Sequence, residues 1–334
     1  MVKARKYVVK KIFEGLPKPE DFEIVEYELP PIKNGEILVK VEWVSVDPYM
    51  RAYNIRYPVP YDQFGYQVGV VEESKDPRYP VGTRVVSHKG WCDYVIIDTS
   101  DPDPVAGELY KLPDLKGYSD SFGIGAVGMP GATAYFGFLE LCQPKAGETV
   151  VVTGAAGAVG SLVGQIAKIK GCKVIGFAGS DDKVKWLEEI GFDKAINYKN
   201  ADAAAALKEA APNGIDCFFD NVGGELSSDI MYQMNEFGRV AICGCISAYN
   251  IDRSKLPKAT IVQLAILGKQ LKVEGFHLWR WKSKIPGAYE QMIKWIKSGE
   301  LKPHEQISKG FENIFDAFVG MLNGENFGKA VVKL

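Results

Sequence analysis

Apolar and polar positions follow two different patterns along this chain of 334 residues, and the change falls near residue 125. Up to that point the apolar residues come in short runs, such as 37–41, 67–71 and 84–86, with Pro and Gly between them. Short β-rich runs bounded by turn-forming residues predict strands. The pattern therefore predicts a compact, barrel-like β domain over residues 1–125.

From Pro130 onward, β-rich runs alternate with segments whose apolar residues recur at helical spacing. The pattern predicts strands at 149–152, 173–177, 195–197, 216–219, 239–243 and 271–274, and helices at 161–170, 183–190, 203–210 and 225–234. Strands that alternate with helices form right-handed crossovers and a parallel sheet. We therefore expect a doubly wound α/β domain over residues 126–298. The remaining segment, 299–334, contains an apolar run at 330–332 that is expected to return to the first domain as a strand.

A glycine-rich segment connects the first strand of the second domain to its first helix. The segment follows the β-branched run 150–152 and precedes an apolar helical stripe that begins at Leu162, and its glycines are Gly154, Gly157 and Gly160. Such a unit presents backbone N–H groups to the pyrophosphate of a dinucleotide at the helix N-terminus. The spacing is G-x-x-G-x-x-G rather than the commoner G-x-G-x-x-G, so a turn that serves only packing stays open as the alternative.

The end of the second predicted strand indicates which dinucleotide is bound. An NAD-specific site usually has an acid there, about 20 residues after the glycines, that binds the ribose hydroxyls. In this chain the segment 177–180 contains no acid, and Lys183 follows within one helical turn. An ammonium group at this place suits a 2′-phosphate, so the sequence favours NADP(H). Asp181 and Asp182 are interpreted as helix-capping and dipole-compensating residues.

Composition and charge exclude several classes of protein. The formal net charge of −2 gives no reason to expect nucleic acid or an anionic membrane as a partner. No apolar run has the length of a signal segment or of a membrane span, which predicts a soluble, cytoplasmic protein. The six scattered cysteines are expected to be buried free thiols in a reducing compartment.

Potential metal ligands are few. The chain has three histidines, and the first domain contributes a single cysteine, Cys92. Cys243 and Cys245 form a C-x-C pair at the end of a predicted strand, where both side chains would point to one face and belong to the core. Zinc needs clustered cysteine or histidine ligands. The sequence therefore predicts no metal site, and no alcohol oxidation that depends on a Lewis-acid metal.

Several longer motifs resemble those of one enzyme family. They are Val-Asp-Pro-Tyr-Met-Arg at 46–51, Gly-Met-Pro-Gly-Ala-Thr-Ala-Tyr at 128–135, Phe-Asp-Asn-Val-Gly-Gly at 219–224, Cys-Gly-Cys-Ile-Ser-Ala-Tyr-Asn at 243–250 and Asn-Phe-Gly-Lys-Ala at 326–330. In this order they resemble the zinc-independent medium-chain dehydrogenase/reductases, and among these the prostaglandin and 2-alkenal double-bond reductases. The resemblance covers nearly the whole chain. It implies a GroES-like β-barrel-type domain, a Rossmann domain with a doubly wound parallel sheet, and a homodimer joined edge to edge by the nucleotide-domain sheets.

The resemblance also implies which residues bind the cofactor. Residues 157–160 would approach the pyrophosphate, and Lys183 with Tyr198 would bind the 2′-phosphate and its ribose. Thr133 and Asn326 would help to fix the nicotinamide. The implied cofactor-binding residues are Thr133, Gly157, Ala158, Val159, Gly160, Lys183, Tyr198, Asn221, Cys243, Gly244, Cys245, Ile246, Ser247, Tyr249, Phe276, His277, Leu278 and Asn326. Without the resemblance, Thr133, Tyr198 and Asn221 would be interpreted as ordinary helix or loop residues.

Reduction of a polarised C=C bond requires hydride delivery and a hydrogen-bond donor for the resulting enolate. Tyr249 is the candidate catalytic residue, because a phenol can donate to the carbonyl oxygen without a metal. The alternative for Tyr249 is a loop residue that only covers the cofactor. Tyr49 and Tyr57 are expected to bind substrate in an apolar, aromatic cleft, with a role as surface cover left open.

These expectations combine into one function and two alternatives. The first is NADPH-dependent reduction of enals and enones, including 15-oxoprostaglandin 13-reductase activity, with leukotriene 12-hydroxyl oxidation as a further activity. The segment 54–64 and His277 depart from the pattern of the prostaglandin-type enzymes, which leaves the choice among apolar enal, enone and eicosanoid substrates open. The alternatives are NADPH-dependent quinone reduction and a non-catalytic, crystallin-like NADPH-binding protein. The intact motif around Tyr249 argues against the second.

Overall fold

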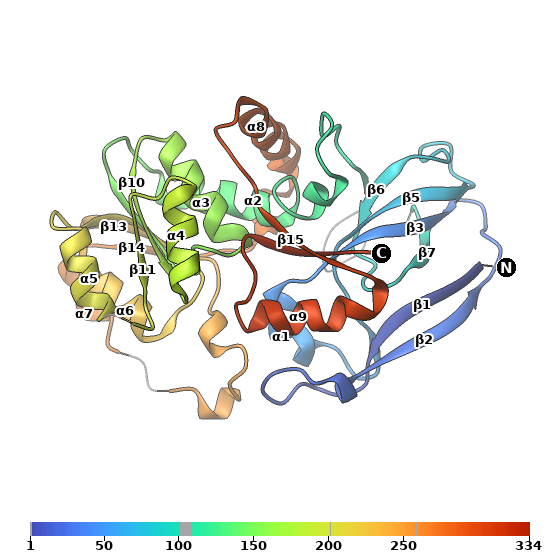
Figure 1. Ribbon diagram of the computed structural model, residues 1–334, viewed down its shortest axis with the longest axis horizontal. Helices are drawn as coiled ribbons and strands as arrows, with labels where there is room; N and C mark the ends of the chain where they lie inside the picture. The colour runs from blue at the N-terminus through green and yellow to red at the C-terminus, as the bar shows by residue number, and fades with distance from the viewer. Residues whose placement is uncertain (1, 101–108, 201, 258–259) are drawn as a thin grey trace. The chain divides into compact units, whose positions relative to one another are not determined.

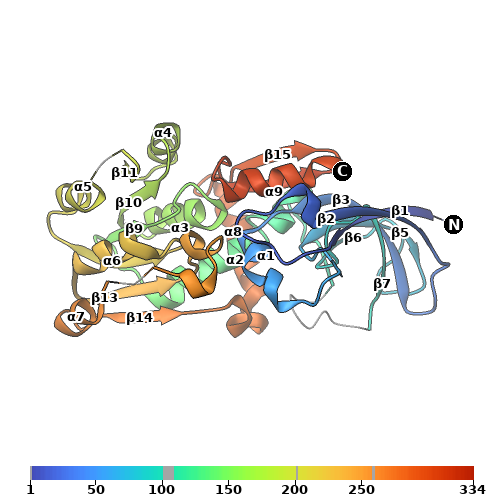
Figure 2. The same ribbon diagram turned by 90° about the horizontal axis from the view of Figure 1, so that it is seen from below.

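The computed structural model describes residues 2–100, 109–200, 202–257 and 260–334. The chain divides into two compact units (Figures 1 and 2). The first, the β unit, consists of residues 1–125, 305–325 and 330–334, and the second, the nucleotide unit, consists of residues 126–304 and 326–329. The short segments 299–304 and 326–329 thus group with the nucleotide unit, although the sequence pattern assigned them to the returning tail.

The β unit is built mainly from antiparallel strands. Its strands are β1 (Val2–Val9), β2 (Phe22–Leu29), β3 (Glu36–Ser45), β4 (Tyr61–Asp62), β5 (Gln67–Ser74), β6 (Arg84–Ser87), β7 (Tyr94–Asp98), β8 (Tyr110–Lys111), β15 (Glu305–Lys309) and β16 (Lys329–Lys333), and its helices are α1 (Pro48–Tyr53) and α9 (Ile314–Leu322). One sheet has the order β2-β1-β4, and the other has the order β15-β16-β3-β5-β6-β8, with β7 also paired to β3. The expected return of the tail is confirmed, because Val331 of β16 pairs with Ser45 of β3.

A buried aromatic cluster forms the core of the β unit. Trp91 is 1% exposed and contacts Phe22, Phe318 and Tyr7 through its ring. The indole N–H of Trp91 donates to the carbonyl of Ser45 at 3.1 Å, which satisfies the one polar group that burial of this side chain would otherwise leave unpaired. The core therefore packs α9, near the C-terminal end of the sequence, against strands from the N-terminal end.

The nucleotide unit alternates strands and helices. Its strands are β9 (Thr149–Val152), β10 (Lys173–Ala178), β11 (Lys194–Asn197), β12 (Ile215–Asp220), β13 (Met234–Ile242) and β14 (Lys272–Gly275); its α-helices are α2 (Met129–Phe136), α3 (Ala158–Ile169), α4 (Asp181–Glu189), α5 (Ala203–Ala210), α6 (Gly224–Tyr232), α7 (Gln263–Gly268) and α8 (Ile285–Ser298). The sheet order is β11-β10-β9-β12-β13-β14, and every pairing is parallel. The predicted doubly wound parallel sheet is thus confirmed.

The strand order reverses between β9 and β12, and helices cover both faces of the sheet. The helices α5, α6 and α7 share one core with it, through Leu207, Ile230 and Ala265 among others, and Figure 1 shows them close together in yellow to orange. In a doubly wound sheet, ligands bind outside the carboxyl ends of the strands at the point of reversal. The glycine-rich turn follows β9 at this place.

The position of the C-x-C pair differs from the prediction. The strand β13 ends at Ile242, so Cys243 and Cys245 lie in the following loop, and the prediction that they sit on a strand is wrong. The N–H of Cys243 makes the last bond of this ladder, to the carbonyl of Asp220 at 2.8 Å, and the N–H of Gly244 turns back to the same carbonyl at 3.1 Å. Within the described ranges, every helix is too short or too polar to span a membrane.

Candidate functional site

The glycine-rich turn brings the start of α3 against the end of β9. Gly154 has a φ of +57°, which an L residue with a side chain rarely adopts, and Gly157 is the N-cap of α3. A Cβ on Gly160 would lie 2.4 Å from the carbonyl oxygen of Gly154, so only glycine allows the helix to approach the turn this closely. The first-turn N–H groups, including those of Ala158 and Val159, have no acceptor within the helix and are arranged for an anion.

A buried carboxylate organises the strand ends beside this turn. Asp220, at the end of β12, is 1% exposed and accepts hydrogen bonds from the hydroxyls of Thr153 (2.8 Å) and Ser227 (2.6 Å). It also accepts from the N–H groups of Val222 and Gly223 at 2.9 and 3.0 Å. These bonds connect the carboxyl ends of β9 and β12 to the N-terminus of α6 and hold the crevice in one shape.

Asn221 lies in the same crevice and joins the same two strands. Its side-chain amide donates to the carbonyl of Thr153 at 2.7 Å, and its N–H donates to the Thr153 hydroxyl at 3.0 Å. Asn221 therefore has a structural role in addition to the cofactor contact that the resemblance implies.

The loop that contains Tyr249 is bound to the segment after β12. The Ser247 hydroxyl donates to the carbonyl of Val222 at 2.6 Å, and the N–H of Ile246 donates to the carbonyl of Asn221 at 3.2 Å. The phenol oxygen of Tyr249 accepts from the N–H of Cys245 at 3.2 Å. A phenol that accepts this bond can still donate through its own hydrogen, so the geometry suits a hydrogen-bond donor at a fixed position.

The expected 2′-phosphate residues lie together at the end of β10. Ser180 is the N-cap of α4, and its side chain accepts from the N–H of Lys183 at 3.4 Å. A Cβ on Gly179 would lie 3.2 Å from the Tyr198 hydroxyl, so the phenol extends over this glycine. Asp181, in the first turn of α4, accepts from the Asn197 amide at 2.7 Å, which accounts for the acid without a ribose contact.

The residues expected near the nicotinamide differ in their surroundings. Thr133, on α2, is 9% exposed, and its hydroxyl donates to the carbonyl of Met129 at 2.7 Å. Phe276 packs its ring on Gly137, where a Cβ would lie only 2.2 Å from a ring carbon. Leu278 is buried, whereas His277 is exposed. Thr133 and Phe276 therefore have contacts within the protein, a hydrogen bond and a packing contact respectively, that do not depend on a cofactor.

Asn326 lies in the short segment of the nucleotide unit that comes after α9. Its amide donates to the carbonyl of Gly328 at 2.7 Å, and it is 8% exposed. The N–H of Gly328 donates to the carbonyl of Ala156 in the glycine-rich turn at 2.8 Å. The segment 326–329 is therefore held directly against the turn that precedes α3.

In the β unit, Tyr49 and Tyr57 belong to an aromatic cluster. The Tyr49 ring stacks on Phe64, with centroids 5.9 Å apart, and the Tyr57 ring contacts Phe64 and Tyr61. The Tyr49 hydroxyl lies 3.0 Å from Nε2 of His88, which is 5% exposed. This cluster provides an apolar surface with hydroxyl groups, which is the chemistry expected of a site for an apolar carbonyl compound.

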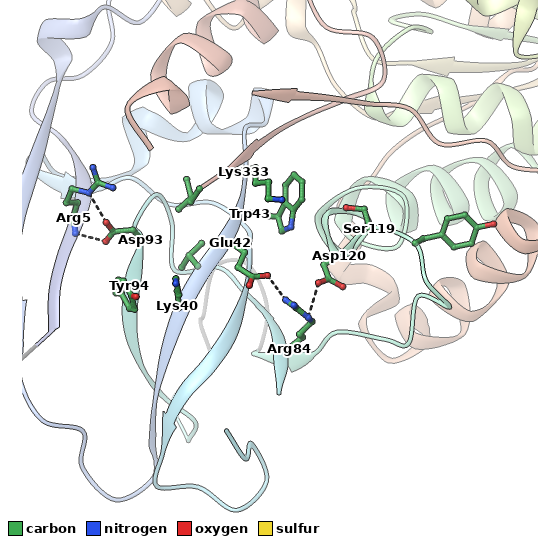
Figure 3. A pocket seen from close by; sticks show the side chains of 13 residues that line it. Arg5, Lys40, Glu42, Trp43, Arg84, Asp93, Tyr94, Ser119, Asp120 and Lys333 are labelled. Carbon is green, nitrogen blue, oxygen red and sulfur yellow. Dashed lines mark hydrogen bonds and ion pairs between the residues drawn. The ribbon is translucent and has the colours of Figure 1, made fainter. Parts of the chain in front are cut away.

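A hollow of about 680 Å³ also lies in the β unit, but it contains none of the expected site residues. Figure 3 shows Arg84 between Glu42 and Asp120, with the Nε of Arg84 2.9 Å from the Asp120 carboxylate. Arg5 likewise pairs with Asp93 at 2.8 Å. The charged side chains that line the hollow form ion pairs with one another, and we assign no ligand to it.

Metal ligands do not gather in the described part of the chain: no group of three or more His, Cys, Asp or Glu side chains could hold an ion there. The six cysteines are free thiols, of which Cys92, Cys142, Cys172 and Cys217 are buried, Cys243 is half-buried and Cys245 is exposed. Burial raises the pKa of the Cys243 thiol to about 12. A metal-free protein stays a prediction.

Sequence reasoning missed Asp220 and His88. An acid directly after a buried strand, in the motif 219–224, was a signal for Asp220, because strand ends at the reversal point carry polar groups. His88 had no signal, since its contact with Tyr49 joins residues 39 positions apart.

Comparisons with known proteins agree with this architecture. Residues 5–105 match the model of the N-terminal domain of oxidoreductase, and residues 158–298 match the model described as zinc-binding dehydrogenase. Prostaglandin reductase 1 of Bos taurus is 48% identical over 335 residues, covering 100% of both chains. The 2-alkenal reductase (NADP(+)-dependent) of Nicotiana tabacum is 39% identical, over 99% of this chain and 97% of its own length.

A solved structure, CurA of Vibrio vulnificus in complex with NADPH, has a TM-score of 0.91 to this chain. It is 36% identical, and the match covers 98% of each chain. A zinc-binding description does not by itself supply ligands, and the described residues hold no such cluster. With relatives this similar over their full length, the chain belongs to the medium-chain dehydrogenase/reductase family.

Proposed function

We propose that this chain reduces the C=C bond of α,β-unsaturated aldehydes and ketones, with NADPH as the hydride donor. The main support is the similarity to a prostaglandin reductase, at 48% identity over the full length of both chains. The structure adds a crevice at the strand ends, beside which hydrogen bonds hold the loop that contains Tyr249. The 2-alkenal reductase of tobacco and the NADPH complex of CurA support the same cofactor and the same kind of chemistry.

The residues present fit a phosphorylated dinucleotide. Gly160 lets α3 begin close to the turn, where its first-turn N–H groups would bind the pyrophosphate. At the end of β10, Lys183 and Tyr198 would bind the 2′-phosphate. The carboxylate of Asp181 accepts a hydrogen bond from the Asn197 amide. NADP(H) is therefore the cofactor of this reductase, with these residues as its proposed ligands.

The chemistry requires little from the protein beyond positioning. The bound cofactor supplies a hydride for the β-carbon, and negative charge then develops on the carbonyl oxygen. Tyr249 would donate a hydrogen bond to that oxygen from a loop fixed by its bonds to the segment after β12. Solvent can protonate the α-carbon, so no further acid is assigned.

The substrate would be either a small apolar enal or enone, or an eicosanoid that carries an enone. Tyr49 and Tyr57 would line its site in the β unit, together with Phe64. Oxidation of a leukotriene 12-hydroxyl would be the reverse type of hydride transfer. The richness of the segment 54–64 in aromatic residues favours compact or planar enones over long chains.

A homodimer would form through β14, the edge strand of the parallel sheet. Beside it, α7 exposes Leu264 and Leu267 by 66% and 79%, and Phe237 of the neighbouring strand β13 is 62% exposed. Exposed apolar side chains beside an unpaired strand edge are typical of an interaction surface. A second copy of this chain would cover both the edge and the leucines.

A cytoplasmic location is supported by the cysteines. All six are free, and four of them are buried in the two cores. Free thiols persist in compartments that are kept reducing.

The experiment that tests the function is NADPH consumption with a matched series of enals, enones and quinones. The proposal expects turnover with the enals and enones and less turnover with quinones. Turnover with quinones alone would favour the quinone reductase, and NADPH binding without any turnover would favour a non-catalytic protein. Metal analysis of the active protein completes the test, because stoichiometric zinc would contradict the predicted absence of a metal site.

A further inference from the structure

The end of β10 carries a second lysine that the sequence motifs do not single out. A Cβ placed on Gly179 would lie 3.2 Å from the Tyr198 hydroxyl and 3.3 Å from Cε of Lys199. Both side chains therefore extend over the same glycine backbone, at the place where an NAD-specific chain would carry its acid.

The backbone fixes this arrangement. The N–H of Tyr198 donates to the carbonyl of Ala178 at 3.2 Å, which attaches the segment after β11 to the end of β10. The N–H of Lys199 donates to the Asn197 side chain at 3.1 Å. The stem of Lys199 is thus held near Gly179 by hydrogen bonds within its own turn.

Lys183 lies in the first turn of α4, which follows the same strand end, and its N–H donates to the Ser180 side chain at 3.4 Å. Its ammonium lies 5.6 Å from the centroid of the Phe327 ring. Burial lowers the pKa of Lys183, and the positive charge of Lys199 lowers it further.

The acid in the first turn of α4 is bonded to amide groups at and after the end of β11. The carboxylate of Asp181 accepts from the amides of Asn197, at 2.7 Å, and Asn200, at 3.4 Å. The phenol of Tyr198 and the side chain of Lys199 lie over one glycine, and Lys183 lies in the first turn of the helix that follows it. This set suits a dianion, and a phosphate monoester carries close to two negative charges at neutral pH.

We infer that Lys199 is a second cationic ligand of the cofactor's 2′-phosphate, opposite Lys183 and beside the Tyr198 hydroxyl. The inference deepens the proposed function, since it rests on NADP(H) as the cofactor and names a residue that determines the preference for it over NAD(H). The phosphate would bind between the two ammonium groups. Binding would therefore gain from Lys199 only when the ligand carries the 2′-phosphate.

The test is equilibrium binding of NADPH and NADH, measured by cofactor fluorescence. Lys199→Gln is expected to weaken NADPH binding about tenfold, the effect of one charge-assisted contact at an exposed site, and to leave NADH within about twofold. Lys199→Arg is expected to retain most of the affinity. The matched control is Lys185→Gln, which removes an exposed lysine of α4 and is expected to change neither affinity.

Salt provides a second readout. The NADPH affinity of the unsubstituted protein is expected to fall more steeply with ionic strength than that of Lys199→Gln, because one fewer charge contacts the phosphate. Equal losses for NADPH and NADH, or no loss, would overturn the role of Lys199. That outcome leaves the proposed reductase intact if enone turnover at saturating NADPH persists, and absence of enone turnover in the unsubstituted protein would overturn the function instead.

Discussion

At the scale of single residues, Tyr249 is the side chain whose role differs most between the candidate functions. Its phenol oxygen accepts from the N–H of Cys245, so the ring is held by its own loop at a defined position. A residue that only covered the cofactor would need the ring but not the hydroxyl. Removing the hydroxyl therefore separates a catalytic donor from a cover.

Tyr249→Phe is expected to lower kcat for enone reduction about a hundredfold, the effect of losing one donor to a developing oxyanion. The measurement is steady-state kinetics at saturating NADPH, with NADPH affinity from fluorescence as the control for loosening of the loop. An unchanged kcat would remove Tyr249 from the mechanism.

The single residues also show where sequence reasoning stops. The close approach at Gly160 was predictable, because it depends on the spacing of the glycines in the chain. The contact of His88 with Tyr49 was not, since the folded backbone brings together residues 39 positions apart. The roles of Lys183 and Tyr198 stay predictions. The C-x-C pair was misplaced because the strand β13 ends at Ile242, where the N–H of Gly244 bonds to the carbonyl of Asp220, and such long-range bonds leave no local pattern.

At the scale of elements, the helix α3 packs on the sheet through a glycine. A Cβ on Gly164 would lie 1.9 Å from a ring carbon of Phe192, which is itself 4% exposed. Gly287 in α8 has nothing within 4 Å of the same position. A larger side chain would therefore clash at Gly164 of α3 but would find open space at Gly287 of α8.

Gly164→Ala is expected to destabilise the protein by about 1–3 kcal/mol through overpacking against Phe192. Gly287→Ala is expected to stabilise it by about 0.5–1 kcal/mol, because the unfolded chain loses freedom and no neighbour has to move. Urea unfolding of the two variants measures both changes. Equal effects of the same sign would contradict the packing described for α3.

A second element-scale feature is the ion pair between Arg239 of β13 and Glu148, which directly precedes β9. The two groups approach to 2.5 Å, and their side chains are 18% and 17% exposed. Arg239 also donates to the carbonyl of Cys142 at 2.8 Å. Burial raises the pKa of Glu148, but the bond from Arg239 and the N–H of Lys145 outweigh it, so the pKa lies below the ordinary 4.5.

Glu148→Gln is expected to cost about 3 kcal/mol at neutral pH, since it leaves Arg239 without its partner. A carboxylate with a lowered folded pKa stabilises the fold above its unfolded pKa of 4.5, and that stabilisation is lost as the pH falls through the folded value. The difference between the two proteins should therefore shrink below about pH 4.5. Urea unfolding at several pH values measures it.

The exposed pair of Arg5 and Glu312 is the matched control, because the Glu312 side chain is 65% exposed. Glu312→Gln is expected to change stability by less than about 0.5 kcal/mol at any pH. A Glu148→Gln difference that stays constant with pH would show that the Glu148 carboxylate does not stabilise the fold through its charge.

At the scale of the whole molecule, the alternation of strands and helices predicted the doubly wound parallel sheet, whereas the position of its reversal between β9 and β12 comes from the structure. The returning strand β16 was also predictable from its apolar run. The grouping of 326–329 with the nucleotide unit was not, because it depends on the bond from the N–H of Gly328 to Ala156. Long-range pairing of this kind is decided by tertiary structure rather than by local pattern.

The proposed dimer belongs to the same scale, and it is tested on α7, beside the edge strand β14. Sedimentation is expected to give a dimer at micromolar concentration, and Leu264→Asp with Leu267→Asp is expected to give a monomer that still binds NADPH. The reason is that two buried charges would oppose covering of α7 by a second copy. A monomeric unsubstituted protein, or a doubly substituted dimer, would contradict this interface.

Double-bond reduction by NADPH is tested by the fate of deuterium supplied by NADPH labelled at the transferable position of its nicotinamide. With an enone substrate, we expect a saturated ketone that carries the deuterium on its β-carbon, as detected by mass spectrometry and NMR. An allylic alcohol with deuterium on the carbinol carbon, or a saturated product without deuterium, would contradict it.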